Sequence, residues 1–124
     1  MDTSIRILVV DDFATMRRIL KNILKQLGFK NITEADDGTA ALELLKKNTF
    51  DLIISDWNMP KMTGLDLLKT IRSSGEHKTV PFLMVTAEAQ KHNVIEAVQA
   101  GVSNYVVKPF TADAIQDKLK KILG

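Results

Sequence analysis

The stretch that decides the fold is DLIISDWNMP, residues 51–60. Its apolar run, Leu52 to Ser55, has the length of a β-strand and leads directly to a carboxylate, Asp56. A run this apolar is typical of a strand that is covered on both faces, as strands in parallel sheets are. We therefore predict that residues 52–55 form the central strand of a parallel sheet and that Asp56 lies at its carboxyl end.

Three further apolar runs end on polar side chains in the same way. They are ILVV at 7–10 before Asp11 and Asp12, FLMV at 82–85 before Thr86, and YVV at 105–107 before Lys108. The carboxyl ends of parallel strands share one edge of the sheet, and ligands bind at that edge in open α/β sheets. We expect the polar side chains that follow the four runs to gather there as a site.

Longer segments alternate with these runs, and in them apolar residues recur every three or four positions, as in amphipathic helices. The helical segments carry Met16 to Leu27, Ala41 to Leu45, Leu65 to Ile71, Val94 to Val98 and Ile115 to Ile122, and a weakly patterned strand falls within residues 29–35. The order βαβαβαβαβα implies right-handed crossovers with helices on both faces of the sheet. We predict an α/β fold, a flavodoxin-like, doubly wound, five-stranded parallel sheet in the order 2-1-3-4-5 with five helices.

Length and composition favour one small globular unit. The chain has 124 residues, so we expect a single domain, 1–124, and it has no cysteine, which excludes a thiolate nucleophile or metal ligand. The net charge is +2 and the basic residues are scattered, which argues against a nucleic-acid partner. No apolar stretch is long enough to span a bilayer, so we expect a cytoplasmic monomer with no membrane partner.

The predicted strand order places strands one and three side by side, which brings Asp11 and Asp12 close to Asp56. Two unit charges about 4 Å apart repel by roughly 4 kcal/mol at an effective dielectric constant of about 20. A cation must offset this repulsion, and Mg²⁺, which binds carboxylates, waters and phosphate oxygens, fits best. Lys108 would supply a second positive charge.

Each of these residues has a simpler interpretation when it is taken alone. Asp11 and Asp12 could be turn and N-cap residues, Thr86 a capping hydroxyl, Lys108 a solvated side chain, and Tyr105 a packed aromatic with its hydroxyl at the surface. The joint placement of polar side chains at four strand ends favours a functional site.

The motifs resemble those of response-regulator receiver domains over essentially the whole chain. The matching segments are VVDDF at 9–13, TMRR at 15–18, ISDWNMP at 54–60, LMVTAEA at 83–89 and SNYVVKPF at 103–110. Trp57 after the central aspartate, and the Ser103-Asn104-Tyr105 run, are similar to the chemotaxis branch of this family.

The resemblance implies a phosphoacceptor. Asp56 would attack the phosphoryl group of a phosphohistidine on a chemotaxis histidine kinase and form an acyl phosphate. Mg²⁺ would be held by Asp12, Asp56 and the backbone carbonyl of Asn58, with Asp11 orienting a coordinated water. The domain would thus catalyse its own phosphorylation and dephosphorylation.

Three further residues would contact the phosphoryl group by the same resemblance. Lys108 would pair with one of its oxygens, Thr86 would supply its hydroxyl, and Ala87 would supply its backbone N–H. The Lys108–Pro109 peptide bond would be cis, as it is in the family.

The resemblance also implies an output surface. Phosphorylation would draw Thr86 inward and let Tyr105 rotate, which changes a surface that binds the flagellar motor switch. The residues of this surface would be Ala89, Lys91, Tyr105, Val107 and Lys118. Asn58 and Glu88 would tune the lifetime of the acyl phosphate, and the sequence leaves open whether a dedicated phosphatase exists.

Two segments depart from the family pattern. Thr63 stands where aspartate is common, and Gln90-Lys91-His92 carries one lysine fewer than in enteric relatives, so partner choice is less secure than the chemistry.

Three other functions compete with the phosphoacceptor interpretation. A haloacid-dehalogenase-like phosphohydrolase would need an Asp-x-Asp pattern, whereas Asp11 and Asp12 are adjacent. A flavin or nucleotide carrier would need a glycine-rich loop after Val10, and a scaffold that is not phosphorylated would not need the complete site.

Overall fold

A computed structural model of the chain describes residues 1–87 and 91–124, and for Lys91 and His92 it describes the backbone alone. The strands are β1 (Arg6–Val10), β2 (Asn31–Ala35), β3 (Leu52–Asp56), β4 (Phe82–Thr86) and β5 (Asn104–Val107). The helices are α1 (Ala14–Gln26), α2 (Gly38–Lys47), α3 (Gly64–Ser73), α4 (Lys91–Gln99) and α5 (Ala112–Leu123). Strands and helices alternate along the chain as the sequence predicted.

The strands form one parallel sheet in the order β2-β1-β3-β4-β5, which confirms the predicted order. Every residue of β3 is buried, in agreement with its predicted central position. The register pairs Val10 with Ser55 across β1 and β3, and Asp56 with Val85 across β3 and β4. The carboxyl ends of these three neighbouring strands therefore lie level with one another.

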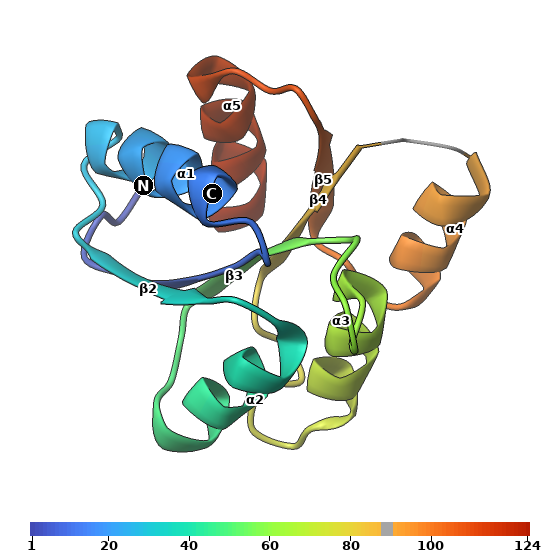
Figure 1. Ribbon diagram of the computed structural model, residues 1–124. Coiled ribbons are helices and arrows are strands. Elements are labelled where there is room, and N and C mark those ends of the chain that lie inside the picture. The colour runs from blue at the N-terminus through green and yellow to red at the C-terminus, as the bar shows by residue number, and fades with distance from the viewer. Residues whose placement is uncertain (88–90) are drawn as a thin grey trace.

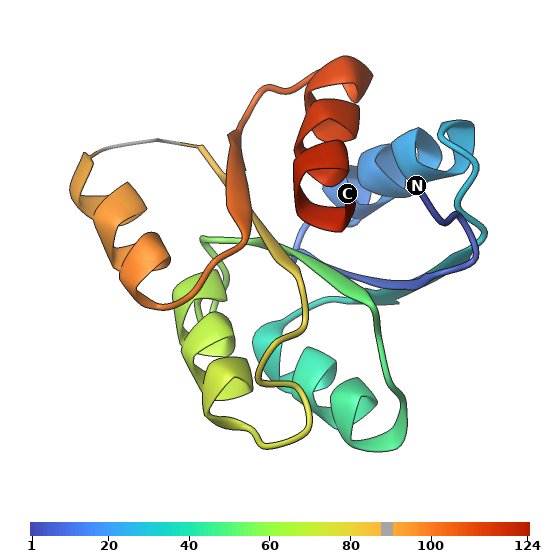
Figure 2. The same ribbon diagram turned by 180° about the vertical axis from the view of Figure 1, so that it is seen from behind.

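Helices cover both faces of the sheet. Figures 1 and 2 show α1 and α5 on one face and α2, α3 and α4 on the other. Alternate residues of β1 enter the two layers, since Ile7 and Val9 pack with α1 and α5, whereas Leu8 and Val10 pack with α2 and α3. Burying one such side chain stabilises the fold by about 1.5–3 kcal/mol, so the two layers hold the strand ends rigidly in place.

Local signals begin and end the helices. Gly28 follows α1 with a φ of 102°, the left-handed conformation in which glycine commonly ends a helix. Thr111 begins α5 by accepting a hydrogen bond from the N–H of Ala114. Thr63 begins α3 in a reciprocal capping box with Asp66, so this departure from the family pattern has a structural role as a helix cap.

Helix α4 leaves two of its large apolar side chains exposed. Ala97 is buried, but Ile95 and Val98 are exposed, so its apolar residues do not all face the core. In the part of the chain that the structure describes, no helix is long and apolar enough to cross a membrane.

Candidate functional site

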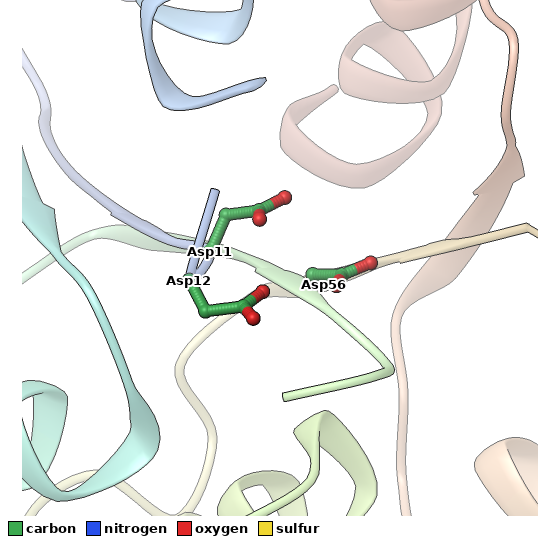
Figure 3. A group of neighbouring side chains, drawn as sticks. All are labelled: Asp11, Asp12 and Asp56. Atoms are coloured by element: carbon green, nitrogen blue, oxygen red, sulfur yellow. The ribbon is translucent and has the colours of Figure 1, made fainter. Parts of the chain in front are cut away.

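Three carboxylates converge at the carboxyl edge of the sheet. Asp11 and Asp12 follow β1, and Asp56 is the last residue of β3. One oxygen from each lies within 4.8 Å of the others, and Figure 3 shows the three side chains grouped at the neighbouring strand ends. The structure therefore brings together the three aspartates that the sequence predicted to meet.

The three aspartates differ in their access to solvent. Asp11 is 1% exposed and Asp56 is 5% exposed, whereas Asp12 is exposed. Burying a charged group costs free energy unless another charge or hydrogen bonds compensate for it. The cluster thus has a buried floor and one side that a ligand can reach from solvent.

Lys108 supplies a positive charge to the floor of the cluster. Its Nζ lies 2.9 Å from Oδ1 of Asp56 and 3.7 Å from Oδ2 of Asp11. The Lys108–Pro109 peptide bond is cis, as predicted. One ammonium offsets one of three carboxylate charges, so the site retains a negative charge that favours a further cation.

Asp11 is held by its own backbone turn. Its Oδ1 accepts a hydrogen bond from the N–H of Phe13 at 2.9 Å, whereas its Oδ2 is buried and has no hydrogen-bond partner among the described residues. Burial raises the pKa of Asp11 above its ordinary value; the N–H of Phe13 opposes this shift, and the charge of Asp56 adds to it. Phe13 is the N-cap of α1 and its side chain makes no capping bond, so Asp11 is a turn residue rather than the helix cap.

The donor set fits a hard divalent cation. Three carboxylates offer oxygens within reach of one another, and the buried Oδ2 of Asp11 faces a site that has an excess of negative charge. Mg²⁺ takes oxygen ligands and is bound by one or two carboxylates together with waters and phosphate oxygens. Asn58, exposed in the loop that follows Asp56, would add its backbone carbonyl to this set.

The loop after β3 is held by Gly64, the first residue of α3, to which the sequence assigned no role in the site. The N–H of Gly64 donates to the carbonyl of Trp57 at 2.8 Å, and the N–H of Trp57 donates to the carbonyl of Val85 at 2.9 Å. A Cβ on Gly64 would come within 2.2 Å of the carbonyl oxygen of Asp56. The backbone of Asp56 therefore lies directly against the beginning of α3.

The other predicted site residues lie at β4 and β5, on the side of Asp56 away from β1. Thr86 is buried at the end of β4, and its carbonyl accepts a hydrogen bond from the N–H of Lys108 at 2.8 Å. Ala87 follows it and is exposed. Tyr105 on β5 is partly buried, and Nζ of Lys118 lies 5.4 Å from the centre of its ring. The packed position of Tyr105 agrees with the simpler interpretation of this residue, and its switching role stays a prediction.

Several predicted residues fall where the structure gives no description. Glu88, Ala89 and Gln90 lie outside the described residues, as do the side chains of Lys91 and His92. The predicted role of Glu88 in acyl-phosphate lifetime stays a prediction, as does the part of the output surface formed by Ala89 and Lys91.

Arg17 is a site neighbour to which the sequence assigned no role. Its Nη1 donates to the backbone carbonyl of Asp11 at 2.7 Å, and its Nε donates to Oε1 of Glu34 at 3.2 Å. The residues that this side chain connects are far apart in sequence, so no local pattern could have revealed the contact.

Known proteins resemble this chain in sequence and in structure. The response regulator receiver domain family matches residues 7–120. Chemotaxis protein CheY-3 of Vibrio cholerae serotype O1 is 57% identical over 122 residues, which cover 98% of this chain and 94% of the relative. Chemotaxis protein CheY of Pseudomonas aeruginosa is 58% identical over 117 residues, 94% of each chain. The solved structure of Vibrio cholerae CheY4 matches with a TM-score of 0.90 at 34% identity, over 96% of this chain and 98% of that one.

Proposed function

The chain belongs to the response regulator receiver domain family, and we propose that it is a chemotaxis response regulator that accepts a phosphoryl group on Asp56. The observation that carries this proposal is the geometry around Asp56. Its carboxylate lies 2.9 Å from the ammonium of Lys108 and within 4.8 Å of oxygens from Asp11 and Asp12. A nucleophile beside fixed charges of both signs suits phosphoryl transfer, in which positioning and electrostatics provide most of the catalysis.

In the proposed reaction, an oxygen of Asp56 attacks phosphorus and the bond from phosphorus to the donor's histidine nitrogen breaks, with the electron pair leaving on nitrogen. Lys108 exchanges its contact with Asp56 for an oxygen of the arriving phosphoryl group. The hydroxyl of Thr86 and the backbone N–H of Ala87 donate to its other oxygens. These donors stabilise charge at the position where it develops.

Asp12, Asp56 and the backbone carbonyl of Asn58 would hold Mg²⁺, and Asp11 would orient a water beside them. When bound, Mg²⁺ neutralises charge on the transferred phosphoryl group. The exposure of Asp12 supports this assignment, because the ion must reach the site from solvent together with its remaining waters. Asn58 and Glu88 would set the access of the hydrolytic water and so the lifetime of the acyl phosphate.

The proposed output is a change in the surface formed by α4, β5 and α5. A phosphoryl group adds about −1.5 to −2 charges beside Thr86, which would draw its hydroxyl inward and let Tyr105 rotate. Val107 is exposed on β5, next to Tyr105 in sequence. We propose that this surface binds the flagellar motor switch, and that residues 1–124 act as a single receiver domain whose upstream partner is a chemotaxis histidine kinase.

Phosphorylation can be tested with acetyl phosphate as the donor. We expect the intact protein to gain the mass of one phosphoryl group when both Mg²⁺ and donor are present, and the Asp56→Asn variant to gain none. The fluorescence of Trp57 is a second readout, because Trp57 follows Asp56 directly and is the only tryptophan. We expect it to change on addition of Mg²⁺ and to change again on addition of donor.

The controls separate acceptor chemistry from damage to the fold. Asp36→Asn removes an exposed carboxylate of the same size outside the cluster, so it should be phosphorylated like the wild type. Phosphorylation of Asp56→Asn at an undiminished rate, or absence of any phosphorylated wild-type protein, would rule out Asp56 as the acceptor.

A further inference from the structure

The side chain of Arg17 joins three elements next to the cation site. Arg17 lies in the first turn of α1, and it donates to the carbonyl of Asp11 at the end of β1 and to the carboxylate of Glu34 on β2. The nitrogens used are Nη1 and Nε, so two different edges of one planar guanidinium are engaged. A rigid group bound at two points fixes the positions of both acceptors relative to each other.

Glu34 is itself held in place on β2. Nζ of Lys21, one turn further along α1, lies 3.5 Å from Oε2 of Glu34, while Arg17 engages Oε1. The N–H of Asp11 donates to the carbonyl of Ala35 at 3.2 Å, which extends the pairing of β1 and β2 by one residue. The guanidinium therefore pairs with a carboxylate that a second cation of α1 also contacts.

The carbonyl that Arg17 binds is well placed to control the site. The carbonyl of Asp11 and the N–H of Asp12 belong to the same planar peptide unit. Rotation of that unit would change the direction of both side chains that flank it. A hydrogen bond of 2.7 Å from a charged donor opposes such rotation.

We propose that Arg17 is a positioning residue for the cation site: by clamping the Asp11–Asp12 peptide against Glu34, it aims both carboxylates into the cluster before the cation arrives. This inference rests on the proposed function, in which the cluster binds Mg²⁺. The role is geometric, because the described contacts of Arg17 are with a backbone carbonyl and with Glu34, not with the carboxylates of the cluster. Partners of this outer kind typically change metal affinity 10–100-fold when they are removed.

The test measures Mg²⁺ affinity by titration of Trp57 fluorescence, with Arg17→Ala set against Arg18→Ala. Arg18 is the next residue along α1 and is exposed, so its removal takes away the same charge without touching the site. We expect Arg17→Ala to weaken Mg²⁺ binding about 10-fold, at the lower end of the effect of such partners, and Arg18→Ala to leave it within about 2-fold of the wild type.

Two further variants separate geometry from charge. Arg17→Lys keeps the positive charge but offers one nitrogen in place of two, so we expect its Mg²⁺ affinity to stay near that of Arg17→Ala. Glu34→Gln keeps an acceptor for Nε and removes the charge, so we expect it to lose less Mg²⁺ affinity than Arg17→Ala. A Mg²⁺ affinity in Arg17→Lys equal to that of the wild type would overturn the geometric role.

A readout without metal checks the same role independently. We expect amide hydrogen exchange at Asp11 and Phe13 to be faster in metal-free Arg17→Ala than in metal-free Arg18→Ala, because Arg17→Ala removes the hydrogen bond to the carbonyl of Asp11. If Arg17→Ala does not fold, Glu34→Ala, which removes the acceptor for Nε altogether, carries the comparison, and unchanged exchange in that variant overturns the proposal. Wild-type protein without a Mg²⁺ response would refute the proposed function, whereas a wild-type response that Arg17→Ala leaves unchanged would refute the positioning role alone.

Discussion

Two regions of the molecule reverse the usual distribution of polar and apolar side chains. At the carboxyl edge of the sheet, Asp11 and Asp56 are 1% and 5% exposed, whereas on α4 the apolar Ile95 and Val98 are 45% and 62% exposed. Buried charge and exposed apolar surface both lower the stability that the same chain could otherwise reach. The stability of the fold alone therefore does not account for the residues present in either region.

The two regions differ in how the reversal is compensated. The buried charges at the strand ends have Lys108 and the N–H of Phe13 as partners within the molecule. Ile95 and Val98 gain no such compensation, because they stand away from the two apolar layers in the part of the chain that the structure describes. The strand edge thus holds buried charges that have partners within the molecule, whereas α4 leaves two apolar side chains exposed to solvent.

The largest expected effect comes from a helix that shows no reversal. Leu119 on α5 is fully buried, and we expect Leu119→Ala to lower the free energy of unfolding by about 2–5 kcal/mol because it leaves a cavity in the layer shared with α1. Urea denaturation followed by circular dichroism measures this loss. A loss below about 1 kcal/mol, less than the burial of a leucine is worth, would mean that α5 is loosely packed and would remove the contrast with the exposed side chains of α4.

A smaller but local effect is expected at Gly64, beside Asp56. The Cβ of Gly64→Ala would clash with the carbonyl of Asp56, so we expect a loss of about 1–3 kcal/mol together with weaker Mg²⁺ binding. Gly75→Ala is the matched control, because a Cβ there meets nothing within 4 Å. Equal stabilities of the two variants in urea denaturation would show that the strand edge is less rigid than its packing indicates.

The sequence predicted the sheet well because the signals for the strands are local. Each of the apolar runs ends on a polar residue, and the central run is apolar throughout, so strand positions and strand direction followed from the pattern, whereas the convergence of Asp11, Asp12 and Asp56 also needed the strand order. The strand order itself was chosen as a known arrangement that fits five strands rather than calculated from the residues.

What the sequence missed depends on contacts between distant segments. Two such contacts are the close approach of Gly64 to the backbone of Asp56 and the side-chain bridge from Arg17 to Glu34. Both depend on how distant segments pack, which no local sequence period encodes. The helical spacing of apolar residues in α4 predicted a helix correctly, but the same spacing is found on helix faces that pack in a core and on faces that do not. Ile95 and Val98 are apolar at helical spacing and still lie outside the core.

Asp11→Asn tests the energetic cost of the buried charge. Burial raises the pKa of Asp11 in the folded protein, so between the unfolded and folded pKa values the folded state binds more protons, and stability falls as pH rises through that window. We therefore expect Asp11→Asn to be more stable than the wild type at pH 7, on the order of 1 kcal/mol, and to show less loss of stability above pH 4. Mg²⁺ binding should weaken in the same variant.

The control for Asp11→Asn is Asp36→Asn, which neutralises an exposed carboxylate and should leave the pH profile of stability parallel to that of the wild type. Thermal unfolding in metal-free buffer across this pH range measures both variants. If the pH profile of stability of Asp11→Asn is also parallel to that of the wild type, the buried carboxylate of Asp11 does not destabilise the fold. The strand edge would then not be a region where buried charge lowers stability.

The smallest expected effect on stability lies at Val98, where apolar surface is exposed. We expect Val98→Ala to change the free energy of unfolding by less than about 0.5 kcal/mol, because the side chain is 62% exposed and alanine has the higher helix propensity. Ala97 precedes it on the same helix and is 1% exposed, so Ala97→Val in the same urea series should cost about 1–3 kcal/mol by overpacking. A loss above about 1 kcal/mol in Val98→Ala would exceed the range for an exposed position and place Val98 in the core. If stability is unchanged and binding of the phosphorylated protein to the proposed partner falls, then Val98 serves association and not folding, just as we propose that the buried aspartates serve phosphoryl transfer and not folding.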